Sequence, residues 1–211
     1  MFKTLSAALI LLLSGSAHPE LISTGVGMVR GQLVTSRQVQ IQNLLEVALY
    51  ETKPKDKLKL LALDSKAFSK ATQDTLLETV VALEAQNFNV IQVTSEEVTV
   101  AEKQVLKLFK DLKAWKSLEV SNKELAQGLK NKIQSKKFIQ FRAQSSVLPI
   151  TDSEAQRYFN ENRLKFGTLP FENFKENIKS FLSRNQVDRR LKDWFEVLLS
   201  KYQVKNLIAE M

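Results

Sequence analysis

The sequence predicts a mainly α-helical fold in which a short pair of strands joins the N- and C-terminal ends of one domain. The 211 residues include only six glycines and four prolines, so long segments lack the residues that usually end a helix. Between these breaks, apolar residues recur at spacings of three and four, which is the period of a helix with one buried face. β-prone segments near the two ends predict the strands.

Residues 1–17 are predicted to be a signal peptide and not an element of the fold. Lys3 precedes the apolar run 5–13, and Gly15 and Ala17 suit a signal peptidase, so we place the cleavage after Ala17. The run has about half the length that a membrane crossing needs. The alternative is an N-terminal helix that packs or anchors in place. We therefore expect an exported protein whose single domain covers residues 18–211.

The first half of the domain is predicted to contain an extended segment followed by three helices. Residues 26–34 are extended, with a turn or bulge at residues 30–32. Thr35 or Ser36 then caps a helix that ends at Tyr50. The next predicted segments are a helix from Ser65 or Thr72 to Ala85, a β-prone piece at residues 89–94, and a helix over residues 95–115.

Three further helices are predicted in the second half. Ser121 with Glu124 and Thr151 with Glu154 have the spacing of capping boxes, in which both side chains satisfy free N–H groups at a helix start. The predicted helices cover residues 121–141, 152–166 and 170–202, and a tail at residues 203–208 is expected to pair with residues 26–34.

The chain is basic, with a net charge of +8, and the surplus is local. Between Glu102 and Arg142 there are eleven Lys or Arg and four Asp or Glu. This region is either a solvated helix surface, an attractor for acidic lipids or polypeptides, or a phosphate-binding patch. Neither interleaved aromatic residues nor a recognition motif accompanies the basic residues. We therefore expect no nucleic-acid partner, and membrane contact only at the periphery.

The residue inventory indicates a non-enzymatic protein without a metal or cofactor. The chain has no cysteine and a single histidine, His18, which excludes a histidine-based triad and the usual zinc and copper sites. Gly25, Gly27 and Gly31 do not match the spacing of a nucleotide-binding fingerprint. A Ser–Lys dyad stays open, because both residue types are abundant.

Three segments resemble the N-terminal domain of the periplasmic chaperone SurA and its relatives. They are residues 31–39 (GQLVTSRQV), residues 150–159 (ITDSEAQRYF) with 160–166 after them, and residues 178–208 with RLKDW at 190–194. Their order along the chain carries the resemblance, and the middle matches only by helix pattern. Full-length relatives contain glycine-rich parvulin-type prolyl isomerase domains. No stretch between Asp64 and Val147 has that glycine content, so isomerase activity is not carried over.

The resemblance implies a periplasmic chaperone-like domain that binds unfolded or extended client polypeptides without ATP, with outer-membrane protein precursors among the expected clients. Four aromatic residues near predicted helix ends or breaks are the candidate peptide-binding residues, with core packing as the alternative for each: Phe138, Phe141, Phe171 and Phe174. The competing hypotheses are an adaptor or structural subunit that docks on one defined envelope partner, and an enzyme of unfamiliar type. Long helices joined by short breaks also allow a domain-swapped dimer.

Overall fold

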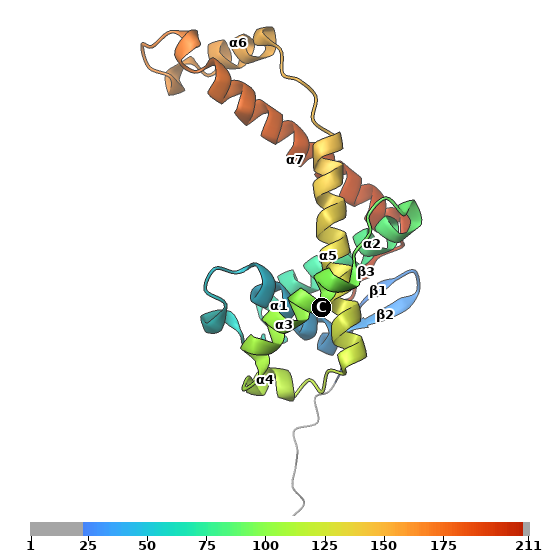
Figure 1. The fold of residues 1–211 in the computed structure, drawn as a ribbon. Coiled ribbons are helices and arrows are strands. Elements are labelled where there is room, and N and C mark those ends of the chain that lie inside the picture. Colours follow the sequence, from blue (N-terminus) through green and yellow to red (C-terminus); the bar gives the residue numbers. More distant parts are fainter. Residues whose placement is uncertain (1–22, 209–211) are drawn as a thin grey trace, which may run out of the picture.

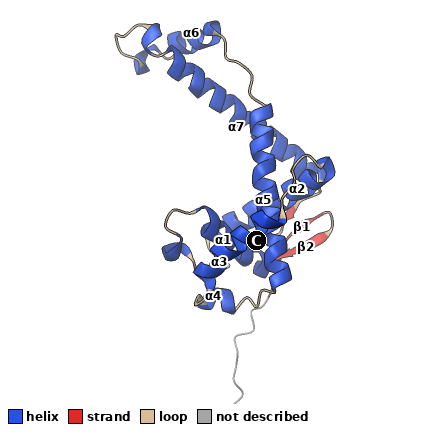
Figure 2. Ribbon diagram, viewed as in Figure 1, coloured by secondary structure: helices blue, strands red, loops and turns tan. Residues whose placement is uncertain are grey.

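The computed structural model describes residues 23–208, which form an elongated, mainly helical molecule with one small sheet (Figures 1 and 2). The predicted signal peptide, its cleavage site after Ala17 and His18 lie outside the described residues. No helix within them is both long and apolar enough to cross a membrane. The α-helices are α1 (Ser36–Tyr50), α2 (Lys66–Phe88), α3 (Ser95–Phe109), α4 (Lys113–Lys116), α5 (Asn122–Ser145), α6 (Asp152–Glu161) and α7 (Lys175–Lys201).

The predicted joining of the chain ends is confirmed, but by a sheet of three strands. Strands β1 (Gly25–Val29), β2 (Gln32–Thr35) and β3 (Lys205–Asn206) are antiparallel and lie in the order β2-β1-β3. The turn between β1 and β2 is made by Arg30 and Gly31, both with positive φ (50° and 79°), as a two-residue hairpin turn requires. The tail therefore adds to a hairpin that the N-terminal segment forms by itself.

Side-chain caps set the starts of the helices. The Thr35 hydroxyl accepts from the N–H of Gln38, whose side chain accepts from the N–H of Thr35, which makes a complete capping box at α1. The predicted box of Thr151 at α6 is likewise complete. At α5, Ser121 accepts from the N–H of Glu124, but the Glu124 carboxylate binds Arg37 of α1 instead. A tertiary ion pair thus replaces half of that box.

We call residues 23–145 together with 194–208 the base, and the base contains two apolar cores. The first core joins the sheet, α2, α5 and the C-terminal end of α7, and its fully buried members include Phe68, Val80, Phe138 and Leu198. The second core joins α1, α3 and α5 around Leu44, Leu45, Phe109 and Leu129. Helix α5 contributes to both cores and is therefore the central support of the base.

The arm, residues 151–182, projects from the base and has a third, smaller core (Figure 1). Ala155 and Phe159 of α6 and Ile178 of α7 are its buried members. The linker, residues 146–150, and the long helix α7 are the two connections between arm and base. Helix α7 is anchored at both ends, because its buried residues are Ile178 in the arm and Leu198 in the base.

The structure corrects one predicted β-prone segment and two predicted helix ends. Residues 89–94 are irregular and not β-like: Asn89 ends α2 in the left-handed conformation (φ 49°). The carbonyl oxygens of Ile91 and Gln92 accept from side chains of α5, at 3.4 and 3.3 Å, so this segment has side-chain donors in place of a neighbouring strand. The helix predicted to reach residue 115 ends at Phe109, and the one predicted to reach residue 166 ends at Glu161.

Candidate functional site

The first pair of candidate aromatic residues lies on α5, where the linker begins. Phe141 is exposed (42 %), but the expected exposure is wrong for Phe138, which is 1 % exposed. The Phe138 ring lies between three others, 5.9 Å from Phe88, 6.2 Å from Phe141 and 5.6 Å from Trp194 between ring centroids. Phe138 is thus a core residue, and Phe141 and Phe88 form the exposed part of the cluster.

The second pair of candidates lies in the arm. Phe171 and Phe174 are half-buried and pack on Phe159, with ring centroids 5.6 and 6.3 Å from it. Their main role in the structure is to fill the small core between α6 and α7. The structure therefore does not bring the four predicted aromatic residues together: one pair is at the junction of base and linker, and the other holds the arm.

A groove beside the linker is an apolar surface that the sequence reasoning missed. Its apolar wall is the linker run of Val147, Leu148, Pro149 and Ile150. The opposite wall is the polar side of α7 at residues 179–184, and the groove has a volume of about 580 Å³. The one sequence signal was Pro149, which predicted a break but not that apolar side chains on both sides of it would stay exposed.

The backbone of the linker is fixed on α7, and this leaves its side chains free. The Leu148 N–H donates to the side-chain oxygen of Gln186 at 3.2 Å. The Arg190 guanidinium donates to the carbonyl oxygen of Ser146 at 2.7 Å. Val147 and Leu148 are each 49 % exposed. Because polar groups of α7 hold the main chain, the apolar side chains are presented on a defined track and not on a loose loop.

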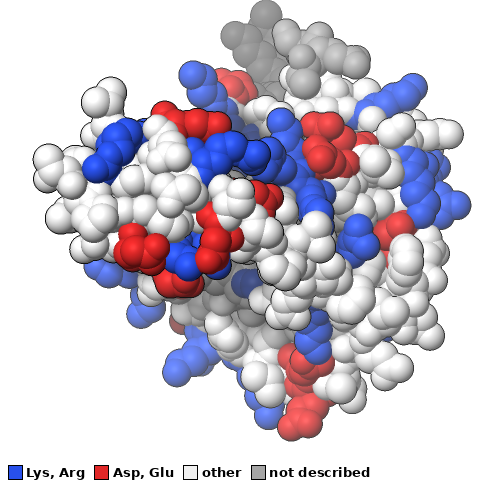
Figure 3. All heavy atoms as spheres, turned by 90° about the horizontal axis from the view of Figure 1, so that it is seen from above, with Lys and Arg blue, Asp and Glu red and all other residues white. Residues whose placement is uncertain are grey.

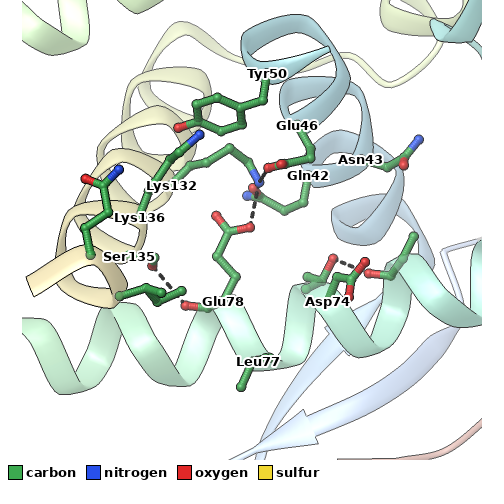
Figure 4. Close-up of a pocket in the computed structure, with 14 residues that line it drawn as sticks. Gln42, Asn43, Glu46, Tyr50, Asp74, Leu77, Glu78, Lys132, Ser135 and Lys136 are labelled. Carbon is green, nitrogen blue, oxygen red and sulfur yellow. Dashed lines mark hydrogen bonds and ion pairs between the residues drawn. The ribbon is translucent and has the colours of Figure 1, made fainter. Parts of the chain in front are cut away.

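A second concave site, of about 440 Å³, lies between α1, α2 and α5 and contains a buried lysine (Figure 4). The Lys132 side chain is 4 % exposed. Its Nζ lies 2.6 Å from Oε2 of Glu78 on α2 and 3.0 Å from Oε2 of Glu46 on α1. An ammonium group removed from water needs such partners. This ion-pair centre links three helices that belong to different parts of the base.

The electrostatics of this centre follow from its burial. Burial raises the pKa of the Glu78 carboxyl above its ordinary value, although the Lys132 ammonium acts in the opposite direction. Burial, with help from the Glu46 and Glu78 carboxylates, raises the pKa of Tyr50 to about 12. The Lys136 Nζ lies 3.2 Å from the centroid of the Tyr50 ring, as a cation–π contact.

The geometry of the ion-pair centre favours a structural role over covalent chemistry. Ser135 is the hydroxyl nearest in sequence to Lys132 on this wall, and it donates to the main-chain oxygen of Glu78 at 3.1 Å. A Ser–Lys dyad needs a neutral amine that accepts the serine proton, whereas the Lys132 amine is held by two carboxylates. Across residues 23–208, no three Asp, Glu, His or Cys side chains gather closely enough to hold a metal ion.

The basic region predicted around α5 is partly neutralised within the chain. Lys132 is paired as described, Lys137 pairs with Glu97 at 2.5 Å, and Lys136 covers Tyr50. Figure 3 shows basic and acidic side chains interspersed on the face seen from the arm end, with broad uncharged areas between them. On this face, the mixed charges are those of an ordinary solvated surface.

Comparisons with protein-family models, with curated proteins and with solved structures found no match to this chain. The resemblance to the SurA family therefore stays a prediction from the three sequence segments.

Proposed function

We propose that the protein is a chaperone-like binder of unfolded or extended polypeptides that acts in the periplasm after export, without ATP and without covalent chemistry. The observation that carries this proposal is the exposed apolar track of the linker. Val147 and Leu148 keep about half of their surface in water, and contiguous apolar surface in a groove marks a place where another chain is bound.

The distribution of exposed apolar side chains supports the same surface. Six of the fourteen large exposed apolar residues lie in or next to the linker and arm: Phe141, Val147, Leu148, Leu164, Leu169 and Phe181. Among them, Leu164 is fully exposed. Client segments with irregularly spaced apolar residues can contact such a dispersed surface at several points, which favours weak and adaptable binding over one fixed partner.

The construction of the arm supports adaptable binding. Between Ile178 and Leu198, no residue of α7 is buried. The helix therefore crosses from the arm core to the base core without a fully buried residue, although Leu182 packs on the arm core and Trp194 on the base core. The arm depends on this helix and the linker for its position. A support of this kind costs little to reorient when clients of different shape bind.

An aggregation assay tests the proposal directly. Insulin is reduced with dithiothreitol in the presence of the purified protein, and light scattering reports aggregation of the released chains. The protein itself contains no cysteine, so the reductant does not alter it. We expect suppression at a few-fold molar excess. The test variant is the double substitution V147S/L148S, which removes the two apolar side chains from the groove.

A matched control distinguishes binding in the linker groove from binding to any exposed apolar side chain. Val100 and Leu106 of α3 are exposed to 60 and 42 %, and V100S/L106S makes the same chemical change on the base. Covering the free half of each linker side chain is worth about 1 kcal/mol, so V147S/L148S should weaken client binding about tenfold or more, whereas the control should not. Equal activity of both variants, or no suppression by the wild-type protein, would refute the proposal.

Two further measurements address the remaining parts of the proposal. A pull-down from an envelope extract should recover a mixed set of polypeptides, whereas one stoichiometric species would favour the adaptor function. Export is tested by N-terminal sequencing of the protein recovered from the periplasm, which should begin at His18.

A further inference from the structure

Strand β2 is an edge strand without the usual protection. Within residues 23–208, the order β2-β1-β3 gives β2 a hydrogen-bonded neighbour strand on one side only. Natural edge strands carry charged residues, prolines or covering elements, because a free row of N–H and C=O groups recruits other chains. The sequence of β2, Gln-Leu-Val-Thr, contains neither a charge nor a proline, and Leu33 at its centre is 53 % exposed.

A hollow of about 610 Å³ lies next to this edge. On the strand side it is lined by β2 and the end of β1, including Leu33 and Val34. On the helix side it is lined by α2, through Thr75, Thr79 and Leu83, and by two glutamines of α1 and one asparagine of α5. The surface beside β2 is therefore concave and made mostly of uncharged side chains.

The combination of free edge and hollow has the geometry that an added strand needs. A further strand would lie about 4.7–4.9 Å from β2, and its side chains would alternate between the two faces of the sheet. Val34 of β2 is buried and faces the helices, so every second side chain of an added strand points toward α2 as well. Strand addition takes its affinity from main-chain hydrogen bonds and its selectivity from pockets for alternate side chains.

Charge defines one end of this site. Among the described residues that line the hollow, Arg30 in the hairpin turn is the charged one, and none is a carboxylate. Within residues 23–208, Arg30 has no ion-pair partner, and its guanidinium carbon lies 5.9 Å from the centroid of the Tyr202 ring. A ligand that follows β2 to the turn thus meets an unpaired positive charge, which is complementary to a carboxylate.

We propose that the edge of β2 and the adjoining hollow form a second binding site, which takes an extended, otherwise uncharged polypeptide segment as an added strand and holds a carboxylate of that segment near Arg30. The inference rests on the proposed function for the class of ligand, but it uses a surface on the base, and not the linker groove. Because β2 has four residues, few main-chain hydrogen bonds form, and the affinity is micromolar or weaker.

Labelled peptides test the main-chain hydrogen bonds without any change to the protein. The probe is a fluorescein-labelled heptapeptide of alternating valine and threonine that ends in glutamate, and its binding is read by fluorescence anisotropy. Two N-methylated forms block alternate amides, one set on each edge of the extended peptide. One set must face β2 and the other must face solvent. We expect one form to lose binding about tenfold or more per blocked hydrogen bond and the other to bind unchanged.

Protein variants test whether the peptide binds at β2. The glutamate peptide and a control peptide ending in glutamine are both amidated at the C-terminus, so that the glutamate side chain is their one difference in charge. R30Q should weaken binding of the glutamate peptide about two- to fivefold and leave the peptide ending in glutamine unaffected. The matched control is R184Q, which removes an exposed arginine of the linker groove. Hydrogen exchange should show added protection of β2 when the peptide is bound, except at the Thr35 N–H, which the Gln38 side chain already holds. V147S/L148S should leave this binding intact, so that failure of the linker proposal and failure of this one are distinguishable.

Three results would overturn the inference: no binding of the probe at millimolar concentration, an equal effect of the two N-methylated forms, or protection elsewhere than at β2. Sedimentation provides the last check. If protection of residues 32–35 depended on protein concentration and not on peptide, the edge would be an interface with a second copy of the chain, and the peptide site would be refuted.

Discussion

Replacing Lys132 by methionine tests whether the ion-pair centre stabilises the base. The substitution K132M removes the ammonium group but retains most of the volume of the buried stem, so the main change is the loss of a charge. Glu78 is left without its cation in a site where its side chain is 21 % exposed. Glu46 is 55 % exposed and loses little, because water solvates its carboxylate.

The expected cost is about 3 kcal/mol of unfolding free energy at neutral pH. Breaking a buried ion pair by removing one partner costs about 3–5 kcal/mol, and the partial exposure of Glu78 places the value at the lower end. The double variant K132M/E78Q removes the stranded charge as well, and should recover about 1–2 kcal/mol. The control K136M changes an exposed lysine on the same helix and should cost no more than about 1 kcal/mol.

The pH dependence has a definite sign. In K132M the folded-state pKa of Glu78 rises further, because burial remains and the nearby cation is gone. The folded state then binds more protons than the unfolded state between the two pKa values, so stability falls as the pH rises through this window. The difference between K132M and wild type should therefore be largest at neutral pH and shrink in acid.

Urea unfolding followed by tryptophan fluorescence measures these differences. Trp194 packs on the first core of the base and Trp115 on the second, so both report on the part of the molecule that Lys132 ties together. A loss below about 1 kcal/mol for K132M, or a loss that does not depend on pH, would show that the centre behaves as a surface ion pair and would refute the reasoning.

Two further predictions concern the closure of the base. Tyr202 is 2 % exposed and its hydroxyl donates to Oε2 of Glu84 at 2.7 Å, so Y202F should cost about 1.5–3 kcal/mol in urea unfolding. Burial raises the pKa of Glu84, but hydrogen bonds from Lys201 and Tyr202 outweigh it and hold the pKa below its ordinary value. The ionised Glu84 carboxylate therefore adds to the free energy of unfolding above the ordinary Glu pKa, and this stabilisation is lost as the pH falls through the folded-state pKa. When stability is measured as a function of pH in acid, Y202F should lose less than wild type. Gly27→Ala should cost about 1–3 kcal/mol, because its Cβ would lie 2.8 Å from Leu76 and 3.1 Å from the carbonyl oxygen of Lys205. In Gly25→Ala the Cβ would meet only the exposed, movable side chain of Leu33, so thermal melts that rank the two alanine variants equally would contradict this account of the strand packing.

Helix starts and turns could be predicted from the sequence, because the residues that determine them are neighbours along the chain. The α1 and α6 starts were found because Thr35 and Thr151 satisfy N–H groups within three residues along the chain. Gly31 predicts a turn or bulge at residues 30–32, because glycine tolerates a positive φ, but the pairing of the two flanking segments as a hairpin is not predicted. The prediction of a β-like segment at residues 89–94 is wrong because residues with high β-propensity form a strand only where a partner strand lies beside them. There the carbonyl groups of the segment meet side chains of α5, which no local pattern records.

The candidate sites depend on contacts that are distant in sequence. Lys132 is one of eleven basic residues between Glu102 and Arg142, and nothing in the sequence separates it from the others. Its burial arises because Glu78 and Glu46, at sequence separations of 54 and 86 residues, meet it in space. The exposure of Val147 and Leu148 likewise follows from Gln186 and Arg190, which hold the linker backbone against α7. The sequence shows how many charged and apolar residues the chain has, but not which of them are buried in the folded protein.

The position of β3 has a consequence for the synthesis of the chain. In the described part of the chain, the central strand β1 obtains its second neighbour from Lys205 and Asn206, and Leu198 and Tyr202 complete the first core. A ribosome must therefore release almost the whole polypeptide before the N-terminal hairpin can be enclosed. Until then the N-terminal hairpin and the first core lack their final packing.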